Sequence, residues 1–332
     1  MKFERYTCNR IVGGVYLLLL VVCVTSCNHK DLEREIDASL RVDFDWSQCP
    51  QASPENMRLC VFHNGSQPIF FPFNGNQGGV IELSFNTFDF VAFNSDTEVL
   101  SYRGDSEDEF EIYSMSTDYI TFSQMFASTR ASLIPHAKGT EQQKVINEPD
   151  PLWASVVKSV RIPGPQSVTM PMQSAVVSYT FTITNVENLS NAAHIAATIS
   201  GMSESYIPSQ QKCSDTYCII PFPLSKLDKE TITGTVRTFG YSDAGVESSK
   251  EENDDNKKKL VVFVQTTDGE KLYYVFDITD ALIDAGRHMD TSTGTVNVEI
   301  TIDSLPIPEA VGGTGMVPTV DGWQEVEIEM NL

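Results

Sequence analysis

Apolar and polar residues alternate along much of the chain. The alternation is clearest over residues 40–46, 177–184 and 296–303, where every second side chain is apolar. Successive side chains of a strand point to opposite faces, so each segment predicts a strand with one buried face and one solvent face. Shorter patterns predict further strands at residues 57–63, 68–73, 80–84, 87–93, 195–201, 231–239, 259–266 and 271–277.

Helical signals are few by comparison. Residues 279–286 begin with a threonine and end with a glycine, which suits two capped turns of helix. We also expect a short helix within residues 118–134 and a single turn within residues 187–192. Residues 267–270 read Thr-Asp-Gly-Glu between two apolar runs, which predicts a hairpin. Many short strands with turns between them predict an all-β fold of the sandwich type.

The length of the chain, 332 residues, exceeds that of a usual single domain, so two domains are expected. Residues 147–151 cannot hold a strand ladder, residues 162–165 read as a linker or crossover, and a boundary is expected between Pro149 and Pro165. The prediction is an N-terminal sandwich over residues 37–160 and a C-terminal sandwich over residues 161–332. Residues 248–259, acids followed by lysines without an apolar residue, predict a solvated hairpin loop.

An apolar run over residues 11–27 follows a basic start. It is shorter than the roughly 20 residues that span a bilayer, which indicates a secretory signal. The run ends in Val-Thr-Ser-Cys and resembles the lipobox of bacterial lipoproteins. This resemblance implies a signal peptide over residues 1–26, a lipidated Cys27 and a polar tether over residues 27–36. Two or more acyl chains, palmitate among them, would hold the protein firmly at a membrane. An ordinary cleaved signal and an uncleaved anchor are the alternatives.

The charge of the chain limits its partners. The formal net charge is −22, and nucleic acid requires a basic surface, so no nucleic-acid partner is expected. Binding to an anionic membrane surface through protein charge is excluded on the same ground. Acidity of this kind is typical of a protein that must stay soluble in a crowded cell envelope.

Four of the seven cysteines lie beyond Cys27, in what would be an oxidising compartment. These candidates for disulfides are Cys49, Cys60, Cys213 and Cys218. Four cysteines allow three pairings, of which the local one, Cys49 with Cys60 and Cys213 with Cys218, is the simplest. Buried thiols are the alternative, and the spacing does not suit a zinc site.

Catalytic signals are missing from the sequence. It contains no nucleophile elbow, no zinc-protease motif, no phosphate loop and no dinucleotide fingerprint. The acidic residues 105–109 lack the spacing of a calcium loop and predict a solvated turn. We therefore expect no enzyme, no metal and no cofactor. Aromatic residues at 70–73 and 273–274 predict core packing, with stacking on sugars as the alternative.

The carboxy-terminal residues 323–332 form a strand pattern that runs to the end of the sequence. The apolar face of this strand consists of Val326, Ile328, Met330 and Leu332. An ordinary last strand of its own sheet explains the pattern. The alternative is a donor strand for a neighbouring subunit, because main-chain bonds give affinity and alternate side chains give register.

Several segments together resemble a known family. They are residues 27–32, 42–46, 139–141, 152–153, 183–189, 199–202, 238–240, 277–280, 305–308 and 323–326. The resemblance is to lipoproteins of unknown function from Bacteroidetes-type gut bacteria, related to the fimbrillin (major fimbrial subunit-like) superfamily. It implies two tandem transthyretin-like, Greek-key β-sandwiches. In polymerising fimbrillins a trypsin-like protease removes the first strand and a neighbour's strand fills the groove. Here Arg34 and Arg41 lie before or within the first strand, and neither marks a specific cleavage site.

These observations favour a non-enzymatic lipoprotein of the outer membrane, anchored at Cys27 and exposed at the cell surface. Its expected role is that of a fimbrial subunit, a fimbrial anchor or an accessory adhesin. Its expected partners are other fimbrial subunits, through strand exchange, and a host protein or glycan. The alternative is a surface glycan-binding lipoprotein of a polysaccharide-uptake system.

Overall fold

The computed structural model describes residues 37–117, 134–241, 257–286, 296–309 and 322–326. Apart from Asp37, these residues belong to one compact unit that spans residues 38–332. Strands dominate it, and its helical elements among the described residues are α3 (Thr279–Gly286), η1 (Leu189–Asn191) and η2 (Pro208–Gln210). Within the same ranges, no helix has the length and apolar character needed to cross a membrane.

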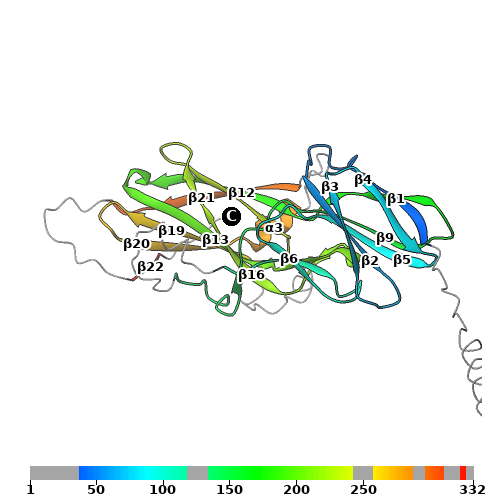
Figure 1. The fold of residues 1–332 in the computed structure, drawn as a ribbon. Coiled ribbons are helices and arrows are strands. Elements are labelled where there is room, and N and C mark those ends of the chain that lie inside the picture. The colour runs from blue at the N-terminus through cyan, green and yellow to red at the C-terminus, as the bar shows by residue number, and fades with distance from the viewer. Residues whose placement is uncertain (1–36, 118–133, 242–256, 287–295, 310–321, 327–332) are drawn as a thin grey trace, which may run out of the picture. The chain divides into compact units, whose positions relative to one another are not determined.

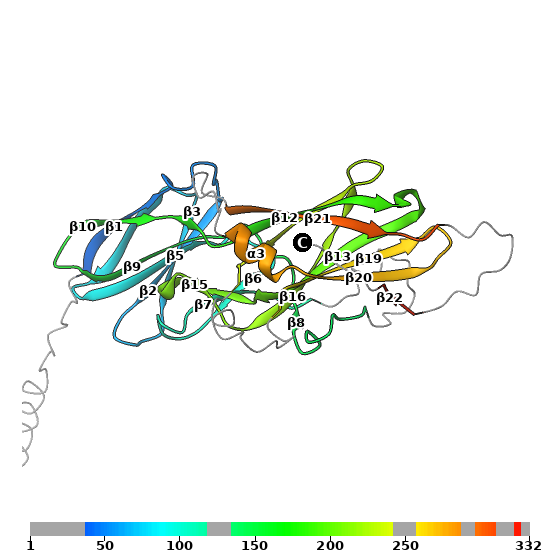
Figure 2. The same ribbon diagram turned by 180° about the vertical axis from the view of Figure 1, so that it is seen from behind.

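The first sandwich packs a three-stranded sheet, in the order β10-β1-β4, against a five-stranded sheet, in the order β11-β9-β5-β2-β3. The bounds are β1 (Asp37–Asp45), β2 (Asn56–Phe62), β3 (Ile69–Asn74), β4 (Gly78–Ser84), β5 (Thr87–Asn94), β9 (Trp153–Arg161), β10 (Gln166–Pro171) and β11 (Gln173–Ser174). Alternate residues such as Leu40, Met57 and Phe90 point between the sheets and are buried there. β1 lies beside β4 in Figure 1 and beside β10 in Figure 2.

The second sandwich packs a four-stranded sheet, β17-β18-β12-β21, against a six-stranded sheet, β22-β20-β19-β13-β16-β8. The bounds are β8 (Lys144–Val145), β12 (Val177–Glu187), β13 (Ala192–Ser203), β16 (Tyr217–Pro223), β17 (Ser225–Lys226), β18 (Ile232–Thr238), β19 (Lys259–Thr266), β20 (Lys271–Asp277), β21 (Val296–Pro306) and β22 (Gln324–Val326). Its core includes Phe181, Val262 and Phe276, all fully buried.

A further four-stranded sheet joins segments from the two halves of the chain. It has the order β15-β14-β7-β6 and contains β6 (Leu100–Arg103), β7 (Glu111–Ser114), β14 (Ser205–Ile207) and β15 (Lys212–Cys213). The buried side chain of Glu204 accepts hydrogen bonds from Arg103 at 3.5 Å and from Lys144 at 3.0 Å. Because charge-assisted bonds of this kind are the stronger ones, they add to the strand pairing between the halves.

Glu111 adds a second polar link in the same sheet, since its carboxylate accepts hydrogen bonds from Arg103 and Ser205. Burial raises the pKa of Glu111, but these two hydrogen bonds and the Arg103 charge outweigh burial and hold the pKa below its ordinary value. The carboxylate is therefore charged, and tied to both halves of the chain, at neutral pH.

The predicted all-β sandwich fold is confirmed, and each segment predicted as a strand from residue 40 onward contains one. The helix over residues 279–286 is α3, and the predicted turn is η1. At the predicted hairpin, β19 pairs with β20 and the Gly269 amide donates to Thr266 O at 3.0 Å. The helix expected within residues 118–134 and most of the loop at 248–259 lie outside the described residues.

Strand β9 occupies residues 153–161, between the proline-rich stretches at residues 147–151 and 162–165, and neither stretch lies within a strand. In addition, β8 pairs with β16 of the second sandwich, whereas β10 and β11 pair with strands of the first. The division of the chain between residues 160 and 161 remains a prediction.

Candidate functional site

β1 is the central strand of its three-stranded sheet. It pairs in parallel with β10 on one side and lies next to β4 on the other. The side chains on its inner face are buried, whereas Ser39 and Arg41 on its outer face are exposed. The inner face consists of Ala38, Leu40, Val42 and Phe44. The strand therefore fills a groove whose walls are the edges of β10 and β4 and whose floor is the core of the sandwich.

Aromatic contacts fasten the far end of β1 in this groove. The ring of Phe44 meets that of Phe73 edge-on, with centroids 5.4 Å apart. The Trp46 indole nitrogen donates a hydrogen bond to Asn76 O at 2.7 Å, and its ring contacts Trp153 with centroids 6.1 Å apart. Edge-on pairs of this geometry add to the free energy of burial. The residues that follow β1 are thus held to the turn before β4 and to β9.

Gly78, at the start of β4, lets the backbone of β4 lie close to that of β1. Its φ of +94° lies in the region that L side chains rarely adopt, and a Cβ atom at this position would lie 2.0 Å from Val42 O. Gly75, in the same turn, has a φ of +89° but no heavy atom within 4 Å of such a Cβ. A side chain would therefore strain the backbone at both glycines, but only at Gly78 would it also clash with β1.

We expect Gly78→Ala to lower the free energy of unfolding more than Gly75→Ala. Both alanines incur about 1–2 kcal/mol for a left-handed backbone. Gly78→Ala incurs roughly 1–3 kcal/mol more, because its methyl group displaces the β1 backbone. Urea unfolding of both variants measures the difference. Equal losses in the two variants would contradict a tight fit between β1 and β4.

Two residues of the predicted maturation and anchoring region, Cys27 and Arg34, lie outside the described residues. Arg41 lies on the outer face of β1, where its Nε atom is 2.9 Å from the Asp43 carboxylate. Solvent reaches both side chains of this pair, which are 63% and 37% exposed, so the pair adds little to stability. The backbone at Arg41 pairs with Ser167 of β10. A protease would therefore need β1 to leave the sheet before it could cut there.

The described part of the carboxy-terminal segment pairs within its own sheet. β22 lies at the edge of the six-stranded sheet, parallel to β20, and Val326 packs against the core of the second sandwich. Trp323 contacts Phe263 edge-on, with centroids 5.1 Å apart. Tyr273 donates a hydrogen bond to Glu325 at 2.8 Å, and burial together with this carboxylate raises the pKa of Tyr273 to about 12. The other predicted donor residues, Ile328, Met330 and Leu332, lie outside the described residues, and the donor role remains a prediction.

The structure describes Cys49, Cys60, Cys213 and Cys218 as thiols, and their pairing in an oxidising compartment remains a prediction. The thiols of Cys49 and Cys213 hydrogen-bond to Met172 O at 3.6 Å and to Phe239 O at 2.8 Å. Cys60 and Cys218 belong to two different hydrophobic clusters, where a thiol packs as a small apolar group. Burial raises the pKa of both thiols far above the ordinary value, which makes them poor nucleophiles.

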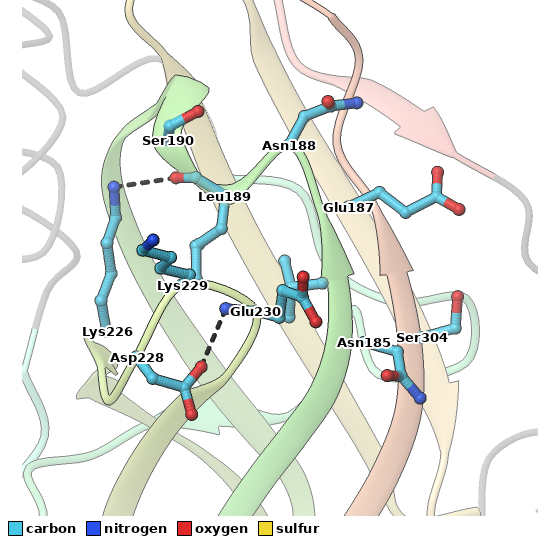
Figure 3. Close-up of a pocket in the computed structure, with 11 residues that line it drawn as sticks. Asn185, Glu187, Asn188, Leu189, Ser190, Lys226, Asp228, Lys229, Glu230 and Ser304 are labelled. Carbon is cyan, nitrogen blue, oxygen red and sulfur yellow. Dashed lines mark hydrogen bonds between the residues drawn. The ribbon is translucent and has the colours of Figure 1, made fainter.

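A polar concavity of about 620 Å³ lies at one end of the second sandwich (Figure 3). Lys226 crosses one side of it and donates hydrogen bonds to Leu189 O at 2.9 Å and Ala192 O at 2.7 Å. The Asp228 carboxylate accepts from the Glu230 amide at 2.8 Å. The ammonium and this carboxylate therefore already bond to the backbone, and no cysteine, histidine or aromatic side chain is among the described residues that line the concavity.

The aromatic residues separate into core and surface positions. Phe73 and Tyr274 are buried, and Tyr274 donates a hydrogen bond to Pro306 O at 2.7 Å, which agrees with the predicted core packing. Phe70 is 38% exposed, and its ring contacts that of Tyr102 at a tilt of 42°, with centroids 5.2 Å apart. In the described ranges, no three His, Cys, Asp or Glu side chains form a group that could hold a metal ion.

Comparison with known proteins agrees with the architecture. A family described as "Domain of unknown function (DUF5119)" matches residues 26–223. A comparison with proteins of curated function gives no match. Three solved structures share the fold at low identity. The first is described as a "putative adhesin" from Bacteroides ovatus, 17% identical, with a TM-score of 0.58 and coverage of 92% of this chain and 99% of that one.

The other two structures cover less of the chain. One is described as "putative polysaccharide binding proteins (DUF1812)" from Bacteroides thetaiotaomicron, 12% identical, with a TM-score of 0.51 and coverage of 80% and 90%. The other is the fimbrial anchor protein Mfa2 from Porphyromonas gingivalis, 10% identical, with a TM-score of 0.50 and coverage of 80% and 90%. At these identities the similarity establishes a common fold.

Proposed function

The chain belongs to the family described as "Domain of unknown function (DUF5119)", and we propose that it is a non-catalytic fimbrial component of the cell envelope. It would act as a subunit, an anchor or an accessory adhesin, held at the outer membrane by lipid on Cys27. The fold that it shares with a fimbrial anchor protein and with a structure described as an adhesin supports this proposal.

The observation that carries the proposal is the position of β1. A first strand that is central in a sheet and buries its alternate side chains can be replaced by a strand of the same pattern from a neighbour. Main-chain hydrogen bonds to β10 and β4 would supply affinity, and the pockets for alternate side chains would fix the register. The partners that this geometry favours are other sandwich subunits with a free terminal strand.

Cross-linking of intact cells that express a tagged chain tests the fimbrial role. We expect other strand-rich envelope subunits to be recovered with the tagged chain, joined through the β1–β4 sheet, when cross-linked peptides are identified by mass spectrometry. Cross-links that map only to cytoplasmic proteins or only within one molecule would overturn the proposal.

The anchor has a separate test, Cys27→Ala. Because acyl chains supply the membrane affinity, we expect the variant to leave the membrane pellet and to lose incorporation of labelled palmitate. Cys8→Ala, within the predicted signal, serves as the matched control and is expected to leave both properties unchanged. If both the wild type and Cys27→Ala stay with the membrane and neither takes up palmitate, lipid anchoring at Cys27 is wrong.

A further inference from the structure

Arg58 on β2 has an unusual environment for an arginine. Its guanidinium carbon lies 5.3 Å from the centre of the Tyr102 ring and 6.0 Å from that of Phe70. These distances are within the range of cation–π contacts, which also restrict the orientation of the planar group. Among the described residues, no hydrogen-bond acceptor or carboxylate pairs with the guanidinium. The cation is therefore held in place by rings while its hydrogen-bond donors remain available.

Arg58 also lines a pocket of about 230 Å³ between the five-stranded sheet and β6. The pocket includes the apolar side chains of Phe93, Ile112 and Leu152, all buried. Hydroxyl groups are supplied by Ser95, Thr97, Ser101 and Tyr102. Among the described residues that line the pocket, Arg58 is the one that carries a charge, in a chain whose net charge is −22.

Hydrogen bonds fix the wall of this pocket in advance. The Asp150 carboxylate accepts from the amides of Glu98 at 2.7 Å and Val99 at 2.9 Å. The Asn94 side chain donates to Asp96 at 3.0 Å and to Pro151 O at 3.1 Å, and it accepts from the Trp153 amide at 2.8 Å. The nearby carboxylates are thus occupied by backbone and amide groups, and a ligand would meet a preformed site with little ordering of the protein.

We propose that this pocket binds a carboxylate-bearing sugar. A guanidinium with available donors recognises a carboxylate through two parallel hydrogen bonds. An apolar floor accepts the carbon face of a sugar ring, and the hydroxyls of Ser95, Thr97 and Ser101 suit its hydroxyl groups. The single positive charge of Arg58 suits a ligand with one carboxylate, and the pocket volume of about 230 Å³ suits a single sugar ring. This binding site is independent of the fimbrial role, because it uses neither β1 nor Cys27.

Calorimetric titration of the mature chain with galacturonate and with galactose tests the proposal. We expect galacturonate to bind at least about tenfold more tightly than galactose, because a hydrogen bond to a charged group contributes roughly 1.5–3 kcal/mol. Arg58→Gln should weaken galacturonate binding by about 10- to 100-fold and leave galactose binding unchanged. Arg58→Lys should fall between the wild type and Arg58→Gln, since lysine keeps the charge and loses the planar pair of donors.

The matched control is Arg161→Gln, which removes the same charge from an exposed position of β9 outside the pocket and should bind galacturonate as the wild type does. Thermal unfolding of each variant shows whether a loss of binding reflects a loss of folding. If Arg58→Gln is unstable, Ser101→Ala, which removes one hydroxyl group of the pocket lining, tests the site instead. Equal affinity for galacturonate and galactose, or undiminished binding by Arg58→Gln and Ser101→Ala, would overturn the proposal. Equal or tighter binding of acetate or of an aspartate-containing peptide would also overturn it, because the sugar ring would then contribute nothing.

Discussion

Leu40→Asp is expected to prevent the mature chain from folding at 37 °C. The Leu40 side chain is fully buried at the centre of β1, between the two sheets of the first sandwich. Loss of a buried leucine costs about 2–5 kcal/mol, and a carboxylate without a partner in the core adds several kcal/mol more. A native domain is stable by only about 5–15 kcal/mol, so the substitution removes most or all of the stability of this sandwich.

Ser39→Asp is the matched control for this prediction. It introduces the same carboxylate one residue earlier, on the exposed face of the same strand. Exposed substitutions change stability by about 0.5 kcal/mol or less, so this variant should unfold in urea at nearly the same midpoint as the wild type. Circular dichroism and urea unfolding of the two variants provide the comparison. Comparable stability of Leu40→Asp and Ser39→Asp would show that β1 does not occupy the groove.

β1 could be predicted from the sequence because the alternation of apolar and polar residues that marks a strand is a local feature of the chain. Side chains of a strand alternate between two faces, and Leu40, Val42 and Phe44 alternate with polar residues over the full strand. The same rule located β12 and β21, whose alternation extends over many residues. It failed for β9, where apolar residues are mixed with serine and lysine and where proline-rich segments lie on both sides.

The sheet that joins the two halves could not be predicted from the sequence. Its strands are two to four residues long, too short for an alternation to be recognised. Its partners are far apart along the chain, since Ser205 pairs with Tyr113. The role of Glu204 likewise depends on Arg103 and Lys144, which only the folded chain brings together.

The candidate sites, like the strands, could be predicted from the sequence only in part. The sequence identified the carboxy-terminal strand pattern, of which Val326 is found at an edge of the second sandwich. It did not identify Arg58, because one of the two rings that hold the guanidinium, Tyr102, comes from β6, which is distant in sequence from β2. The sequence left disulfides and buried thiols open for Cys60 and Cys218, and the fold buries both side chains in hydrophobic clusters.

A chain that begins at Trp46, and so lacks β1, is expected to fail to fold alone and to fold when β1 is supplied as a peptide. Removal of β1 uncovers the pockets of Leu40, Val42 and Phe44 and the edges of β10 and β4. Burial of three such side chains contributes roughly 5–9 kcal/mol, which is comparable with the whole stability of a domain. A peptide of residues 37–45 restores the same side chains and the same main-chain partners.

Native mass spectrometry of the shortened chain, refolded with and without this peptide, tests the exchangeable first strand most directly. We expect a one-to-one complex with cooperative unfolding in the presence of the peptide, aggregated chain in its absence, and no complex with a peptide that carries Leu40→Asp. A shortened chain that folds to a stable monomer without any peptide, or one that binds the two peptides equally well, would show that β1 is not an exchangeable strand.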